Sequence, residues 1–173
     1  MKNISVNIGL INPKSPENVG SVMRAAGNFR IDSVVYTGER YLRALNLKTG
    51  SVDMGRKVSQ QIPLSSVSCL MESMPKGMKR VCVEFVEHAI SLPEYRHPDN
   101  VIYIFGPEDG SISQELIDNA DDVIYVPTIG CMNLAATVNV VLYDRLAKGP
   151  QDFASNALIC QSRDINNNLT ISH

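Results

Sequence analysis

Short apolar runs alternate with amphipathic segments along most of the chain. Apolar or β-branched runs predict strands at 4–10, 33–38, 80–87, 100–106 and 122–127. Apolar residues at helical spacing predict helices at 18–29, 63–73, 113–120 and 134–148, with N-caps at Asn18 and Ser113. Residues 39–63 are polar and basic, and their pattern assigns no element. Because strands and helices alternate, the chain is predicted to be an α/β domain with a mainly parallel sheet flanked by helices.

The apolar runs VIYIF and VIYV are nearly continuous, which is typical of strands covered on both faces. In sheets of this kind, ligands bind beyond the carboxyl ends of the strands. The loops that follow the strands are therefore where binding residues are expected.

The composition fits one globular domain. The chain has 173 residues, of which 44% are hydrophobic and 20% charged. The polar pattern from residue 150 onward predicts a single domain at 1–149 followed by a tail or extension at 150–173. No apolar stretch has the length of a membrane span, and the first residues lack the layout of a signal peptide, so a cytoplasmic protein is expected.

Cysteines and histidines are few and scattered. The four cysteines form no CxxC pair and the three histidines form no cluster, so neither a metal site nor a disulfide framework is expected.

Charge is distributed unevenly between the two halves of the chain. Residues 1–80 hold 12 Lys and Arg against 5 Asp and Glu, whereas residues 81–173 hold 4 against 13, and the net charge is −2. A basic half permits an anionic partner such as RNA at one face. The alternative is that the two halves neutralise each other where they meet.

Three loops after predicted strands carry unusual polar residues. The first runs from Asn12 through NPKSPENVG and contains Asn18, followed by Arg24 on the next helix. The second, FGPEDG, presents Glu108 at a strand tip, and the third, GCMNL, places Asn133 between a strand and a helix. Taken alone, each is more typical of a structural feature: a capped helix, a tight turn and a locally bonded amide, respectively.

Taken together, the motifs NxGxxxRxA, FGPEDG and VPTxGxMNLAxxVxVVLYD occur in a specific order and spacing. Over about residues 4–148 this combination resembles the SPOUT superfamily of RNA methyltransferases, specifically the SpoU-type tRNA/rRNA ribose 2′-O-methyltransferases. The resemblance implies an α/β fold with a C-terminal deep trefoil knot, which no pattern argument could predict because knots are rare. It also implies S-adenosylmethionine as cofactor, S-adenosylhomocysteine as product, and a homodimer. In such a dimer, the first-motif helix of one subunit meets the pocket of the other.

Site residues are carried over from the resemblance by position. The catalytic residues implied are Arg24, Asn18, Glu108 and Asn133. The cofactor-binding residues implied are Ile104, Phe105, Gly106, Pro107, Glu108, Gly110, Tyr125, Val126, Pro127, Ile129, Cys131, Met132, Asn133 and Leu134. Cys131 stands where family members commonly have serine, and Asn139 has no motif role, so helix packing is expected for it.

The expected roles follow from the chemistry of methyl transfer to a ribose hydroxyl. Arg24 stays charged, so it is expected to grip a phosphate and stabilise the developing alkoxide rather than act as a base. Asn18 is expected to orient Arg24. Glu108 is expected to fix the pocket, and Asn133 to hold substrate or cofactor.

RNA contacts are expected from the basic half of the chain. The candidates are Arg30, Arg40, Arg43, Lys48, Arg56 and Lys57. No separate RNA-binding domain is evident, which favours a structured RNA, with tRNA ahead of rRNA. Two alternatives remain: a SPOUT enzyme that methylates a base nitrogen, and a catalytically weak RNA- or nucleotide-binding module of the same fold.

Overall fold

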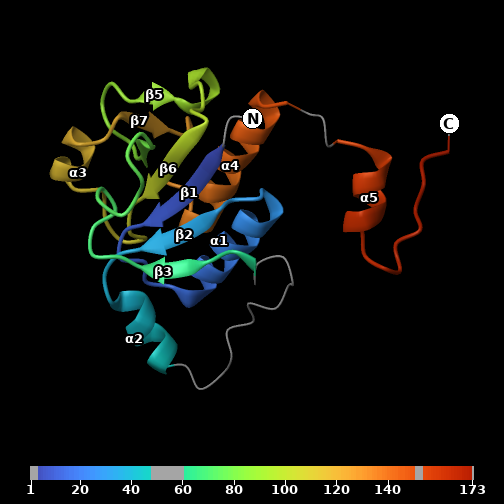
Figure 1. Cartoon of the computed structure of the whole chain (residues 1–173), viewed down its shortest axis with the longest axis horizontal. Helices are drawn as coiled ribbons and strands as arrows, with labels where there is room; N and C mark the ends of the chain where they lie inside the picture. The colour runs from blue at the N-terminus through green and yellow to red at the C-terminus, as the bar shows by residue number, and fades with distance from the viewer. Residues whose placement is uncertain (1–3, 48–60, 151–153, 173) are drawn as a thin grey trace.

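The computed structural model describes residues 4–47, 61–150 and 154–172. Within them a seven-stranded sheet has the order β3-β2-β1-β6-β4-β7-β5, and all neighbouring strands are parallel (Figure 1). The strands are β1 (Ser5–Leu10), β2 (Ser33–Tyr36), β3 (Leu64–Ser66), β4 (Lys79–Val83), β5 (Ile90–Ser91), β6 (Asn100–Phe105) and β7 (Asp122–Tyr125). The prediction of an α/β fold with a parallel sheet is confirmed.

The helices are α1 (Pro16–Asn28), α2 (Arg40–Leu47), α3 (Gln114–Asp118), α4 (Leu134–Lys148) and α5 (Asn156–Ser162), with a short 3-10 turn η2 (Leu92–Glu94). Helices α1 and α4 pack against each other and share one large apolar cluster with the sheet. A second cluster on the opposite face of the sheet includes residues of α3 and of the 67–78 segment.

Strand β6 shows how the sheet divides these two clusters. Val101, Tyr103 and Phe105 pack in the cluster with α1 and α4, whereas Ile102 and Ile104 pack in the other. Alternate side chains of a strand point to opposite faces, so a continuous apolar run is what a strand covered on both sides requires. Burial of each such side chain stabilises the fold by about 1.5–3 kcal/mol.

Several predicted elements differ from those observed. The helix predicted at 63–73 is wrong: residues Leu64–Ser66 form β3, which pairs with β2 at the edge of the sheet. Backbone pairing to an open sheet edge outweighs the weak helical spacing there. The predicted N-cap Asn18 is also wrong, because Ser15 caps α1 and Pro16 occupies the first turn.

Other boundaries shift for local reasons. Strand β4 ends at Val83, four residues before its predicted end. Helix α2 lies within the segment that the pattern left unassigned, and α5 lies within the predicted tail. The predicted N-cap Ser113 is confirmed, since its hydroxyl accepts from the Leu116 amide.

A polar network anchors the C-terminal half of α4 to the segment before β6. The His97 side chain is 5% exposed, with Nε2 2.8 Å from Asp144 Oδ2 and Nδ1 2.5 Å from the Tyr103 hydroxyl. Arg145 donates to that hydroxyl over 3.1 Å, and burial raises the pKa of Tyr103 to about 12. Lys148 forms an ion pair of 2.7 Å with Asp144. The position of α4 is thereby fixed at the end remote from Asn133.

The segment after α4 contains α5, whose residues are almost entirely exposed. Figure 1 shows α5 apart from the sheet and its covering helices. Among the described residues, no helix combines the length and hydropathy that a membrane span needs.

Candidate active site

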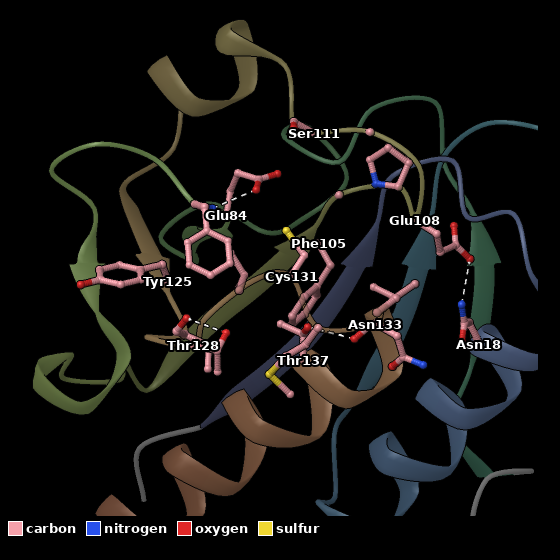
Figure 2. A pocket seen from close by; sticks show the side chains of 18 residues that line it. Asn18, Glu84, Phe105, Glu108, Ser111, Tyr125, Thr128, Cys131, Asn133 and Thr137 are labelled. Atoms are coloured by element: carbon pink, nitrogen blue, oxygen red, sulfur yellow. Dashed lines mark hydrogen bonds between the residues drawn. The ribbon is translucent and has the colours of Figure 1, made fainter.

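A pocket of about 430 Å³ lies at the carboxyl ends of three neighbouring strands, β4, β6 and β7. The start of α4 and one residue of α1 complete its wall. Figure 2 shows it extending from Tyr125 at one end to Asn18 and Glu108 at the other. Its volume lies within the range of small-molecule sites, about 300–1,000 Å³.

Most of the residues predicted to bind the cofactor line this one pocket. They are Phe105, Gly106, Pro107, Glu108, Gly110, Tyr125, Val126, Cys131, Met132, Asn133 and Leu134. The remaining three do not line it. Ile104 is fully buried in the cluster on the opposite face of the sheet, and Pro127 and Ile129 are exposed beside the pocket.

Sequence reasoning missed six lining residues. They are Val83, Glu84, Phe85, Ser111, Thr128 and Thr137. Val83, Glu84 and Phe85 line the pocket because β4 lies between β6 and β7 in the sheet. The linear sequence does not reveal this strand order. Thr137 could have been found, because it lies one helical turn after Asn133 on the same face of α4.

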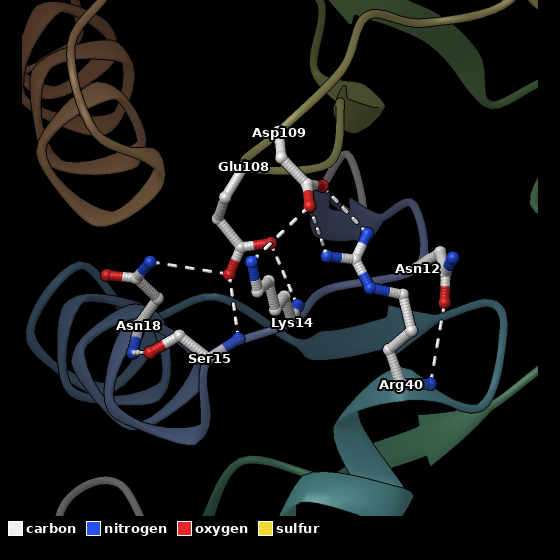
Figure 3. A network of polar contacts seen from close by, with 7 residues as sticks. All are labelled: Asn12, Lys14, Ser15, Asn18, Arg40, Glu108 and Asp109. Atoms are coloured by element: carbon white, nitrogen blue, oxygen red, sulfur yellow. Dashed lines mark hydrogen bonds and ion pairs between the residues drawn. The ribbon is translucent and has the colours of Figure 1, made fainter.

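Glu108 connects the second motif to the first, as Figure 3 shows. Its carboxylate accepts hydrogen bonds from the backbone nitrogens of Lys14 (2.8 Å) and Ser15 (3.0 Å) and from Asn18 Nδ2 (3.3 Å). Partial burial alone would raise the pKa of Glu108, but these hydrogen bonds outweigh it and hold the pKa below its ordinary value. Glu108 is therefore an ionised anchor between the loop after β6 and the start of α1.

Asp109, the next residue, forms a bidentate ion pair with Arg40, with both N···O distances 2.8 Å. Lys14 Nζ lies 3.5 Å from the same carboxylate. Hydrogen bonding by Arg40 lowers the pKa of Asp109. These ion pairs join the basic half of the chain to the acidic half. They therefore support the alternative interpretation of the charge distribution, in which the two halves neutralise each other where they meet.

The predicted RNA-contacting arginines are mostly engaged with other groups. Arg40 is held by Asp109, and Arg43 on α2 forms an ion pair with Glu39, the residue that precedes this helix. Arg30 is exposed at the end of α1 with a positive φ of 56°. Lys48, Arg56 and Lys57 lie outside the described residues.

Arg24 is exposed on α1 and does not line the pocket of its own chain. Within the described ranges its side chain forms no hydrogen bond or ion pair, and Asn18 is bonded to Glu108 instead. The two residues lie six positions apart on the helix, so they face different directions.

The segment from Val126 to Asn133 forms the junction between β7 and α4. Thr128 Oγ1 donates to the Gly130 carbonyl over 2.9 Å, and Gly130 has a φ of +95° that favours glycine. Asn133 caps α4 by accepting from the Ala136 amide at 2.8 Å, while its side chain lines the pocket. Asn139 donates to the Ala135 carbonyl over 2.8 Å, so its amide is bonded locally within the helix.

Cys131 is exposed in the pocket wall, and no disulfide joins any of the four cysteines. The described ranges contain no group of three His, Cys, Asp or Glu side chains placed to hold a metal ion.

The fold and the pocket define the class: a parallel α/β protein with a ligand site at the carboxyl edge of its sheet. Residues 5–143 match the SpoU rRNA Methylase family. The chain therefore belongs to this family and is an RNA methylase.

Similar proteins agree with this assignment. The chain is 27% identical over 161 residues to tRNA (cytidine-2′-O-)-methyltransferase TrmJ of Methanocaldococcus jannaschii, covering 84% of this chain and 69% of that relative. A structure described as giving insights into the 2-OH methylation of C/U34 on tRNA aligns with a TM-score of 0.68 and 20% identity, covering 85% of this chain and 92% of the other.

The SpoU methyltransferase AviRb of Streptomyces viridochromogenes, solved with AdoMet, aligns with a TM-score of 0.63 and 16% identity. This match covers 85% of the present chain but spans only 61% of AviRb. At these identities the solved structures support the fold.

Proposed function

We propose that this protein transfers a methyl group from S-adenosylmethionine to a ribose 2′-hydroxyl of RNA, with tRNA as the substrate class. The observation that carries the proposal is the single pocket that gathers all three sequence motifs, through Asn18, Glu108 and Asn133. The names of the relatives support it: one is a tRNA 2′-O-methyltransferase and one was solved with the cofactor.

The pocket suits the proposed cofactor in size and chemistry. Its volume of about 430 Å³ is adequate for a nucleoside with an amino-acid arm. Val83, Phe105 and Leu134 offer apolar walls for a base, and Thr128 and Thr137 offer hydroxyls. When bound, the cofactor supplies an activated methyl group, so the protein has to align the hydroxyl and stabilise its developing charge.

Each implied catalytic residue has a role that fits its position. Glu108 holds the loop after β6 against α1, and Asn18 supports Glu108 rather than Arg24. Asn133 holds the start of α4 and presents its amide to the ligand. Arg24 grips a phosphate beside the target ribose and stabilises the alkoxide.

Arg24 acts in the pocket of the partner subunit of a homodimer. Its exposure, its lack of a partner in the described residues and its absence from its own pocket support this arrangement. Mixing Arg24→Ala with Asn133→Ala protein tests it. Heterodimers contain one intact composite site, so activity returns on mixing, whereas no recovery in verified heterodimers would contradict a shared site.

The chain from β7 to α4 forms the knot that the family resemblance implies, within a domain at 1–149 followed by an extension at 150–173. The contacts of α4 with the preceding 92–99 segment support the threading: Arg145 donates to the Pro98 carbonyl over 2.7 Å, and Lys148 bonds the carbonyls of Leu92 and Tyr95. Helix α4 is thus held by a loop that precedes it in the chain.

The decisive experiment is transfer of tritiated methyl groups from S-adenosylmethionine to total RNA from a strain lacking this protein. We expect label in the tRNA fraction, recovered after nuclease digestion as 2′-O-methylated nucleosides, and its loss with Arg24→Ala. Label recovered in a methylated base would show the base-nitrogen alternative instead. Cofactor binding without any transfer would show a binding module.

A further inference from the structure

Glu84 is a pocket residue that none of the three motifs contains. It directly follows Val83, the last residue of β4, and its half-buried side chain lines the pocket (Figure 2). Both carboxylate oxygens are engaged by backbone: Oε1 accepts from the Phe85 amide at 2.9 Å, and Oε2 accepts from the Ile112 amide at 3.1 Å.

The bond to Ile112 fixes one wall of the pocket. Ile112 is 6% exposed and lies near the end of the loop that leads from β6 to α3, two residues before Gln114. The loop passes close to Glu84, since a Cβ at Gly106 would lie 3.4 Å from Glu84 Oε2 and 3.2 Å from Ile112 Cγ1. Glu108 anchors the middle of this loop on α1, so Glu84 supplies a second and separate anchor.

The hydrogen bond that Glu84 accepts from the Phe85 amide concerns another wall of the pocket, the one that Phe85 and Tyr125 form. It orients the carboxylate toward Ile112 and restrains the backbone from which the Phe85 ring projects. That ring lies 6.0 Å from the Tyr125 ring, centroid to centroid, and both rings line the pocket at the ends of β4 and β7. One carboxylate therefore connects the loop after β6 to an aromatic pair.

We propose that Glu84 is a positioning residue for the cofactor pocket, whose carboxylate holds the 106–112 loop and the Phe85–Tyr125 pair at the spacing that the cofactor requires. This role rests on the proposed function. A carboxylate suits it because both of its oxygens only accept, and each faces an amide N–H. A glutamine keeps one acceptor and turns an NH₂ group toward the other N–H.

Calorimetric binding of S-adenosylhomocysteine to Glu84→Gln, Glu84→Ala and wild-type protein tests the role. We expect Glu84→Gln to weaken binding about tenfold, the effect expected when the freed loop keeps its binding geometry only about a tenth of the time in the unliganded variant. Glu87→Gln is the matched control, because Glu87 lies on the same loop, is exposed, and has no hydrogen bond or ion pair in the described residues.

Hydrogen exchange separates positioning from a general loss of stability. In Glu84→Gln without ligand, we expect faster amide exchange confined to residues 106–112, with a urea midpoint only slightly below that of Glu87→Gln. Binding within twofold of wild type, or exchange that rises uniformly over the sheet, would overturn the role. Glu84→Gln decides the matter even if Glu84→Ala does not fold.

The wild-type titration separates this inference from the proposed function. If wild-type protein binds no S-adenosylhomocysteine, the proposed function fails and the role of Glu84 fails with it. If wild-type protein binds and Glu84→Gln binds equally well, only the inference about Glu84 fails.

Discussion

Glu108 Oε1 lies 3.0 Å from the backbone nitrogen of Ser15, although 93 positions separate the two residues in the sequence. Ser15 caps α1, so the Glu108 carboxylate sits at the positive end of a helix and close to its free amides. This contact brings the first and second motifs to one edge of the sheet. It makes Glu108 a structural part of the site whatever further role it has with substrate.

Replacing Glu108 with glutamine should destabilise the fold by about 1 kcal/mol at neutral pH, a modest value because the side chain is partly exposed to solvent. The folded-state pKa of Glu108 lies below its ordinary value of 4.5, so the ionised form is the stabilising one. Its contribution is present above that ordinary value and is lost as pH falls through the folded pKa. Urea unfolding of both proteins from pH 7 to pH 3 checks this.

The difference between wild type and Glu108→Gln should accordingly shrink below about pH 4.5. Glu115→Gln on the first turn of α3 is a suitable control, since Glu115 is exposed and outside the pocket. A difference that persists unchanged at pH 3 would contradict the assigned charge state.

Replacing Arg24 with alanine should reduce methyl transfer at least about 100-fold, as expected for loss of a group that stabilises charge in the transition state. The fold should be unaffected, because Arg24 is exposed and has no bonding partner in the described ranges. Single-turnover transfer at saturating cofactor, together with the thermal midpoint, checks both parts. Lysine at this position should restore only part of the rate, since it lacks the planar fork of arginine.

Replacing His97 with glutamine should remove a pH-dependent part of the stability. Burial lowers the pKa of His97 despite the nearby Asp144 carboxylate, while Arg145 and Lys148 lower it further. The neutral ring is therefore favoured in the folded state, and its contribution is present above the ordinary histidine pKa of 6.5 and lost as pH falls through the folded pKa. Wild-type stability should fall below pH 6.5 more steeply than that of His97→Gln.

Urea midpoints at pH 8 and pH 5.5 measure this difference. At pH 8, we expect His97→Gln to be less stable by about 1–3 kcal/mol because Tyr103 and Asp144 lose their shared partner. His88→Gln, an exposed position, provides the control for histidine titration in general. Parallel pH curves for wild type and His97→Gln would show that His97 does not titrate as inferred.

Cys131 should be protected from alkylation by S-adenosylhomocysteine. It is exposed in the pocket wall, whereas Cys160 is exposed on α5 and lies outside the pocket. Mass spectrometry after brief treatment with iodoacetamide should show a decrease in labelling of Cys131 with ligand and unchanged labelling of Cys160. Equal protection of the two cysteines, or of neither, would place the ligand elsewhere.

Most of the fold could be predicted from local pattern. Strands such as Asn100–Phe105 are continuous apolar runs, and helix Leu134–Lys148 has an N-cap at Asn133, so local sequence was sufficient to identify them. Strand Leu64–Ser66 could not be found this way, because its three residues become a strand only by pairing with β2. Helix α2 was not predicted, although Tyr41 and Leu45 lie four positions apart and both pack on the core, because this short helical pattern is surrounded by polar and basic residues.

The residues of the candidate site also fall into two groups, those that the sequence reveals and those that only the fold reveals. Asn18, Glu108 and Asn133 belong to motifs that are visible in the sequence, and the structure gathers them in one pocket. Glu84 and Phe85 carry no motif, and they reach the pocket because β4 lies between β6 and β7.

The sequence by itself determined the alternation of strands and helices, the covering of the sheet on both faces and the three motifs. These depend on properties of short segments: apolar periodicity, capping side chains and turn residues. Only the tertiary structure decided the order of the strands, the pairing of Arg40 with Asp109 and the contact of Glu84 with Ile112. Such contacts join residues far apart in the chain, and the packing of the whole sheet selects them, so no local pattern records them.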